Sequence, residues 1–514
     1  MFIAHIKQEN NEFIIQTLTE HLRNVALYAS KSIGDLGLYN TAYLAGLTHD
    51  MGKAKQEYCE YIVAAGNGES VNKGSVNHTF AAVIWLWEHY HNKNNTKEQK
   101  YACEIISYAV GAHHGLFNAM SEDGMDGFRH RLDHIQDNEK HAIHYQEAIT
   151  NFFEECATES EVNELFEKAT GEINLQLNHI TAGCADQKPI FEKGSEKKFA
   201  VGMLMRIILS VLIEADRRDT AEFMNGIIYP KQIEDMSHVW SKQINYMEQK
   251  LTALMKTDTP INRARTKISD QCKRFAQNHS GIYRLSVPTG SGKTLVSLRY
   301  ALEHARQHNK KRIVLITPLL AVIEQNEKVI REYIEDTNLI LTHHSNVIIS
   351  SYEDSETMNR YEVLAENWLS PIVITTLVQF LNTLFLGKTT AIRRMAALSD
   401  CVIVIDEIQS VPGNMISLVN CALNYLAYCC KSTILLCSAT QPVFEQVAHP
   451  LHLSQPCDII PYEIDLWKAF QRTQTVDMTT EKGFSYDEVV EFSLETMKDR
   501  TIRSLTQKFL LIPI

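Results

Sequence analysis

The sequence contains no pair of cysteines at the C-x-x-C spacing that zinc sites and redox motifs use. Its eleven cysteines are scattered, and Cys401, Cys421 and Cys437 lie inside apolar runs. Reduced, buried cysteine has this distribution in cytosolic proteins. The pattern therefore excludes a disulfide framework and a cysteine-ligated zinc finger, and it predicts a cytoplasmic protein.

A segment that would enter a membrane is also missing. The start, MFIAHIKQENNEF, lacks the basic stretch and apolar run of a signal peptide. The most apolar helix candidate, residues 199–212, is interrupted by Arg206 and followed by Glu214 and Asp216. We therefore expect no membrane partner.

Positive charge is not in excess, since the formal net charge is -12. This excludes a broad basic surface that binds DNA by neutralising phosphates. It does not exclude nucleic acid as a partner, because main-chain N–H groups, hydroxyls and helix N-termini inside a groove can hold a phosphate backbone.

The chain of 514 residues is too long for one core, because single cores stop growing at about 250 to 300 residues. Its first part has helical spacing with almost no strand alternation, beginning with a helix candidate at 13–33. From about residue 270, short apolar strands alternate with helical stretches, which predicts a parallel sheet covered by helices. The expected parts are an all-α domain at 1–225, a helical linker at 226–262, an α/β domain at 263–457 and a further linker with the start of another domain at 458–514.

Histidines and aspartates that suit metal binding recur in the all-α part. Imidazole and carboxylate groups bind manganese, iron, nickel or cobalt, and adjacent pairs such as His49–Asp50 can serve two neighbouring ions. Ions held with open positions for water and phosphate hydrolyse phosphodiesters. The candidate ligands are His21, His49, Asp50, His78, His113, His114 and Asp216.

The order of these motifs is more specific than any one of them. It is the signature of HD-superfamily phosphohydrolases, and it most closely resembles the HD nuclease of type I CRISPR-associated nuclease-helicases, beginning at Ala4–His5 and covering about residues 1–225. The resemblance implies that the candidates bind divalent transition metal and that Lys53 lies near the scissile phosphate. Arg217 and Arg218, beside Asp216, can contact DNA or pair with Glu214 and Asp219.

A phosphate-binding loop lies in the second half, between a strand and an amphipathic helix. Its glycines let backbone N–H groups approach phosphate oxygens, its lysine reaches the outer phosphates and its last threonine can hold magnesium. The first position of the strict pattern is Val287, and superfamily 2 helicases commonly relax that position. The predicted ATP-binding residues are Thr289, Gly290, Ser291, Gly292, Lys293 and Thr294.

Two later motifs resemble those of superfamily 2 DEAD/DEAH-like helicases. In DEIQSVP, the resemblance places Asp406 on magnesium and Glu407 as the group that activates water. In SATQP, it links the nucleotide state to the DNA-binding groove. Stretches near Thr317 and at 375–380 resemble the motifs by which a first RecA-like domain grips single-stranded DNA, with hydroxyls and amides that suit sequence-independent phosphate contact.

A complete motor of this family has a second RecA-like domain, which supplies an arginine finger. After a helix expected at 486–498, residues 501–514 do not resemble the strand that would open that domain. We therefore expect a chain truncated within the second domain, by a frameshift near residue 500 or by a split gene whose partner chain carries that domain.

The family resemblance implies a protein that degrades foreign single-stranded DNA after an RNA-guided, Cascade-like surveillance complex opens it. Two alternatives stay open. One is an HD phosphohydrolase that acts on nucleotides or cyclic oligonucleotides, with the ATPase as its regulator. The other is a catalytically silent remnant that binds DNA or the surveillance complex.

Overall fold

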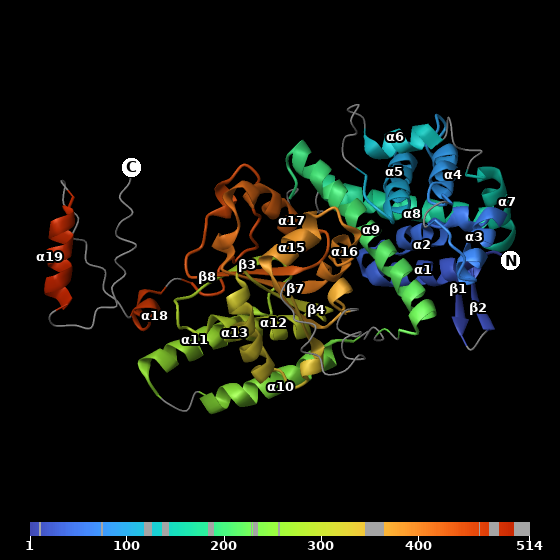
Figure 1. Cartoon of the computed structure of the whole chain (residues 1–514). Coiled ribbons are helices and arrows are strands. Elements are labelled where there is room, and N and C mark those ends of the chain that lie inside the picture. The colour runs from blue at the N-terminus through green and yellow to red at the C-terminus, as the bar shows by residue number, and fades with distance from the viewer. Residues whose placement is uncertain are drawn as a thin grey trace.

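The computed structural model of the chain has an all-α domain followed by an α/β domain (Figure 1). It describes residues 1–9, 12–72, 76–117, 126–135, 143–182, 190–227, 229, 235–254, 258–344, 364–461, 463–471 and 483–497. None of the helices described is both long enough and apolar enough to cross a bilayer.

The first domain begins with an antiparallel hairpin of β1 (Ile3–Glu9) and β2 (Glu12–Thr17). The helix expected at 13–33 is therefore wrong in its first part. Residues 12–17 pair with β1, and α1 begins only after Thr17, whose hydroxyl accepts a hydrogen bond from the Glu20 amide. Thr17 is thus an N-cap, which separates the strand from the helix.

The remaining elements of this domain are helices, most of which pack around one apolar core, while α3 packs on β1. They are α1 (Leu18–Ile33), α2 (Tyr39–Thr48), α3 (Gln56–Gly66), α4 (Ala81–Tyr90), α5 (Lys97–Ala112), α6 (Gly127–His134), α7 (Tyr145–Glu155), α8 (Glu159–Ala182) and α9 (Gly194–Asn225).

The α/β domain contains a six-stranded, all-parallel sheet in the order β3-β8-β7-β4-β6-β5. Its strands are β3 (Ile282–Ser286), β4 (Arg312–Thr317), β5 (Ile340–His343), β6 (Ile372–Thr376), β7 (Cys401–Asp406) and β8 (Thr433–Ser438). The expected strands are confirmed, and so is the parallel sheet. Each inner strand is buried along almost its whole length, which is typical of a sheet covered on both faces.

Helices cover both faces of this sheet. One core contains α10 (Ser237–Leu254), α11 (Pro260–Phe275), α12 (Lys293–Gln307) and α13 (Leu320–Tyr333). Although α10 lies in the expected linker, it packs against α12, and the indole of Trp240 donates to the carbonyl of Lys310 at 2.8 Å. The opposite face carries α15 (Leu377–Phe385), α16 (Thr389–Ile392) and α17 (Ile416–Tyr428). Two short helices, α18 (Ile464–Lys468) and α19 (Tyr486–Met497), follow the sheet.

Helix α9 joins the two domains, since it packs on α1, α2 and α5 on one side and on α16 and α17 on the other (Figure 1). Ser210 of α9 donates to the Arg393 carbonyl at 3.2 Å and accepts from the Ala396 amide at 3.0 Å. The Glu214 carboxylate forms a buried ion pair with Arg393. The two domains therefore share a continuous packed interface.

Candidate metal centre and ATP site

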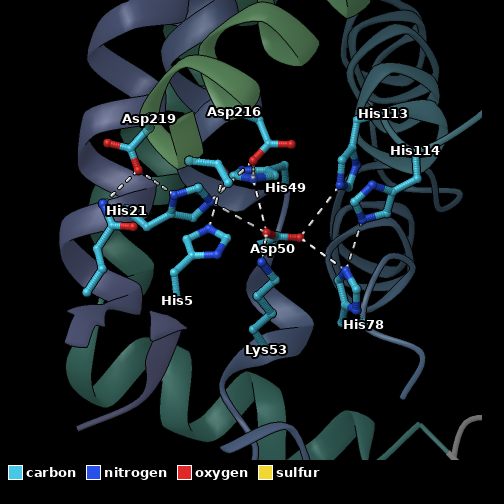
Figure 2. Close-up of polar contacts among 12 residues, drawn as sticks. His5, His21, His49, Asp50, Lys53, His78, His113, His114, Asp216 and Asp219 are labelled. Carbon is cyan, nitrogen blue, oxygen red and sulfur yellow. Dashed lines mark hydrogen bonds and ion pairs between the residues drawn. The ribbon is translucent and has the colours of Figure 1, made fainter. Parts of the chain in front are cut away.

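The predicted metal ligands converge from separate elements onto one point in the all-α domain (Figure 2). Asp50, at the end of α2, is at the centre and is 1% exposed. Its contacts come from α1, from the loop before α4 and from the end of α5, while Asp216 of α9 contacts His21 and His49 beside it. The residues brought together are His21, His49, Asp50, His78, His113, His114 and Asp216.

The ligand atoms form two overlapping groups. In one, atoms of His21, His49, Asp50 and Asp216 lie within 4.8 Å of one another, and in the other, atoms of Asp50, His78 and His114 do so. The Asp50 carboxylate belongs to both groups. One oxygen lies 3.2 Å from His49 Nε2, and the other lies 3.6 Å from the Nε2 atoms of His78 and His113. A carboxylate placed in this way can bridge two ions.

Buried atoms without hydrogen-bond partners point into this centre. They are Nε2 of His21, His49 and His113, and Oδ1 of Asp50. An unpaired buried polar atom is costly, and divalent metal ions bound here would satisfy these four atoms. The donor set of imidazole and carboxylate is also the set that transition metals prefer. The residues present therefore fit a divalent transition metal.

The other ring nitrogen of His49, His78 and His113 is engaged by a backbone carbonyl. Nδ1 of His49 lies 2.8 Å from the Gly46 carbonyl, Nδ1 of His78 lies 3.1 Å from that of Val76, and Nδ1 of His113 lies 2.6 Å from that of Val110. Contacts of this kind fix the tautomer and aim Nε2 at a metal.

His21 is oriented by Asp219, a residue that sequence reasoning considered only as a partner for arginine. Asp219 Oδ2 lies 2.6 Å from His21 Nδ1 and also accepts from the Gln16 amide at 2.8 Å. The expected pairing was wrong, because Arg218 pairs with Glu222 and Arg217 donates to Thr389 of the α/β domain. The i, i+3 spacing of Asp216 and Asp219 on one helix was the available signal.

Carboxylates set the electrostatics of the centre. Burial would lower the pKa of His21, but contacts with Asp216 and Asp219 outweigh it and raise that pKa to about 10. Burial would raise the pKa of Asp50, yet the charges of Lys53 and His49 hold it well below its usual value. His21 and His49, whose pKa values are raised, therefore favour positive charge, and a divalent cation would supply it. Burial instead lowers the pKa of His78 to about 4 and that of His114 to about 3.

Lys53 and His5 lie beside this centre. The Lys53 ammonium is 2.7 Å from Asp50 Oδ2 and is almost fully buried, so its charge is paired with the predicted ligand. His5 packs its ring edge-on against His21, with 4.9 Å between the ring centroids, and its Nε2 shares a hydrogen bond of 3.2 Å with the Thr220 hydroxyl.

The predicted ATP-binding residues lie at the carboxyl edge of the parallel sheet. Residues 287–292 connect β3 to α12, and Gly290 and Gly292 have φ values of 85° and 86°, which favour glycine. Lys293 begins α12, and its ammonium lies 2.8 Å from Asp406 and also pairs with Glu407. The phosphate loop and the DEIQ motif therefore meet at one site, where nucleotide phosphates would replace the carboxylates as partners of Lys293.

The DEIQ and SAT motifs are joined by a direct contact. Ser438, at the end of β8, donates its hydroxyl to the Gln409 side chain at 2.6 Å, and the Thr440 amide donates to the Ser438 hydroxyl at 3.1 Å. Thr317 and Thr376 are register partners at the ends of β4 and β6. The stretches predicted to contact DNA thus lie on neighbouring strands at this edge.

Two family models match the two domains. Residues 12–185 match the model described as Cas3, HD domain, and residues 234–447 match that of the DEAD/DEAH box helicases. The chain is a Cas3-like fusion of an HD domain and a helicase domain. Asp216 lies beyond the matched part of the Cas3-like HD domain, but α9 brings it into the centre.

Solved structures similar to this Cas3-like chain include T. fusca Cas3 with ADP, at 16% identity and a TM-score of 0.49, which covers 86% of this chain and 50% of that one. T. fusca Cas3 with ATP has 15% identity and a TM-score of 0.48, with the same coverage. A chain from a CRISPR RNA-guided surveillance complex, pre-nicking, has 15% identity and a TM-score of 0.37, covering 83% of this chain and 44% of that one. The chain thus spans about half the length of these structures. No curated protein matches it.

Proposed function

We propose that this chain cleaves single-stranded DNA at the HD centre, with divalent manganese, nickel, cobalt or iron as the cofactor. The observation that carries the proposal is the convergence of unpartnered imidazole and carboxylate atoms on Asp50. His21, His49, Asp50 and Asp216 would hold one ion, and His78, His113 and His114 would hold a second ion together with Asp50. Such ions supply an activated water and offset phosphate charge.

The protein's own residues contribute orientation and charge. Asp219 and the backbone carbonyls keep the imidazoles in one tautomer, and the Lys53 ammonium lies close enough to Asp50 to contact a phosphate bound there. In the second domain, Lys293, Thr294 and Asp406 would bind Mg-ATP, and Glu407 would activate water. We propose that this domain moves along single-stranded DNA for the nuclease, in CRISPR antiviral defence.

The proposed partners are single-stranded DNA, a Cascade-like surveillance complex and, for a working motor, a second RecA-like domain in the same protein or on a separate chain. We also propose that the domains divide at residues 225, 262 and 457, as the sequence predicts.

A substrate panel tests the proposed function. The chain, stripped of metal and supplied with Mn²⁺, should cut single-stranded DNA and leave nucleotides and cyclic oligonucleotides intact. Asp50→Ala should lose the cutting, and Asp133→Ala, which removes a partly exposed carboxylate on α6, should retain it. Cleavage of nucleotides but not of DNA would establish the phosphohydrolase alternative, and no cleavage of any substrate would leave only a binding role.

A further inference from the structure

Lys55 is a fully buried lysine that the proposed chemistry does not use. It lies two residues beyond Lys53, at the N-cap position of α3, and its exposed fraction is 0%. Burying an ammonium is costly unless its hydrogen atoms all find partners. The position therefore requires a structural explanation.

The Lys55 ammonium makes two hydrogen bonds and one ion pair. It donates to the backbone carbonyl of Asn77 at 3.0 Å and to that of Ile143 at 3.1 Å, and it pairs with the Glu57 carboxylate at 3.1 Å. These acceptors belong to the loop before α4, to the segment before α7 and to α3 itself. Lys55 thus joins three segments that are far apart in sequence.

One of those segments carries a predicted metal ligand. Asn77 directly precedes His78, whose Nε2 lies 3.6 Å from Asp50 Oδ1 and 3.0 Å from His114 Nε2. The same loop rests on Gly52, where an added Cβ would lie 2.1 Å from the His78 carbonyl oxygen. The His78 backbone is therefore fixed by close packing at Gly52 and by the hydrogen bond from Lys55 to its neighbour.

We propose that Lys55 is a positioning residue for one half of the metal centre, the half formed by Asp50, His78, His113 and His114. Its ammonium reaches the loop of His78 through Asn77, whereas its other partners, Ile143 and Glu57, are not ligands of the other half, which is formed by His21, His49 and Asp216 with Asp50. The inference rests on the proposed function, because it requires that the centre binds metal. It goes further because it predicts that metal binding by only one of the two halves depends on Lys55, a residue that is not itself a ligand.

Metal titration of the full chain tests this assignment. The metal-free protein, titrated with Mn²⁺ in a calorimeter, should show two classes of site. Lys55→Met keeps a long side chain but removes the three donors. It should weaken about 10- to 100-fold the class that His78→Ala also weakens, as loss of an outer-shell partner does, and leave the other class unchanged.

A thermodynamic cycle separates positioning from general stability. In the double variant Lys55→Met/His78→Ala, metal binding should be no weaker than in His78→Ala alone, because the effect of Lys55 passes through His78. Lys168→Met, which removes an exposed lysine paired only within α8, is the matched control and should bind metal normally.

Several results would overturn the inference. Equal weakening of both classes, or full additivity with His78→Ala, would make Lys55 a residue of general stability. The same conclusion would follow if neither Lys55→Met nor Lys55→Gln folded in the presence of saturating Mn²⁺. Wild-type protein that binds no metal would instead refute the proposed function, which is a distinct outcome.

Discussion

At the scale of single residues, the HD centre depends on groups that contact the Nδ1 atoms of its imidazoles, on the side away from the Nε2 atoms that face Asp50. His21 differs from its neighbours because its Nδ1 faces a carboxylate, Asp219, whereas His49, His78 and His113 use backbone carbonyls. A carboxylate in this position makes the imidazole a stronger ligand. Asp219 is 2% exposed, and it also accepts from Gln16 and Asn24, so its orientation is fixed.

Asp219→Asn should therefore weaken metal binding about 10- to 100-fold, since it removes the charge behind His21 and keeps the shape of the side chain. Calorimetric titration with Mn²⁺ measures the change. Asp133→Asn on the surface of α6 is the control and should bind metal as the wild-type protein does. Unchanged affinity in Asp219→Asn would show that His21 needs no charged partner.

The sequence reveals the predicted ligands better than it reveals their supports. His49–Asp50 and His113–His114 stand in recognisable motifs, and the structure brings them together. Asp219 and Lys55 carry no motif of their own. Their roles depend on which segments meet in space, and periodicity along one chain does not determine that.

At the scale of elements, α9 serves both domains. Asp216 reaches the metal centre, whereas Glu214, two residues earlier, pairs with Arg393 of the α/β domain and accepts from the Asn367 amide at 3.1 Å. The helical spacing of α9 was predictable. Its packing partners were not, because an apolar helix face does not determine which other elements pack against it. The hairpin of β1 and β2 was missed for a similar reason, because residues 13–17 fit both a helix and a strand until their pairing with β1 is known.

Arg393→Met should destabilise the protein by about 3 to 5 kcal/mol, because it leaves the Glu214 carboxylate buried without its cation. Chemical denaturation, followed by fluorescence, measures the loss. Adding Glu214→Gln should recover most of it, since the neutral amide can still accept from Asn367. Arg331→Met, at a partly exposed pair within α13, should change stability by less than about 0.5 kcal/mol. An Arg393→Met variant as stable as the control would show that the interface does not depend on this pair.

At the scale of the whole molecule, the nuclease and ATP sites lie in different domains. Within the residues described, one parallel sheet carries one phosphate loop, which provides one RecA-like surface for ATP. The family resemblance predicted this arrangement from the order of the motifs. The packing of α10 into the core on one face of the sheet was not predicted, because the polar residues of this helix suggested a solvent-exposed linker.

The 514-residue chain should bind Mg-ATP but hydrolyse it at a negligible rate. The phosphate loop and Asp406 are assembled, but hydrolysis also needs the arginine finger that a second RecA-like domain supplies, which is worth about 10³ to 10⁵ in rate. Lys293→Ala should weaken binding of a fluorescent ATP analogue, and supplying the second domain should restore ATPase and unwinding. Robust DNA-stimulated hydrolysis by the chain alone would contradict this expectation.

We propose that the centre around Asp50 is a metal-dependent nuclease that works without the motor. The most direct measurement is the rate at which the purified chain cuts single-stranded DNA in Mn²⁺ with no ATP, compared among the wild-type, Lys293→Ala and Asp50→Ala proteins. We expect equal rates for the wild-type and Lys293→Ala proteins. Asp50→Ala should lose at least about 100-fold in rate, since it removes the carboxylate that both groups of ligands share. Cutting by Asp50→Ala at the wild-type rate, or cutting that requires ATP and Lys293, would contradict this proposal.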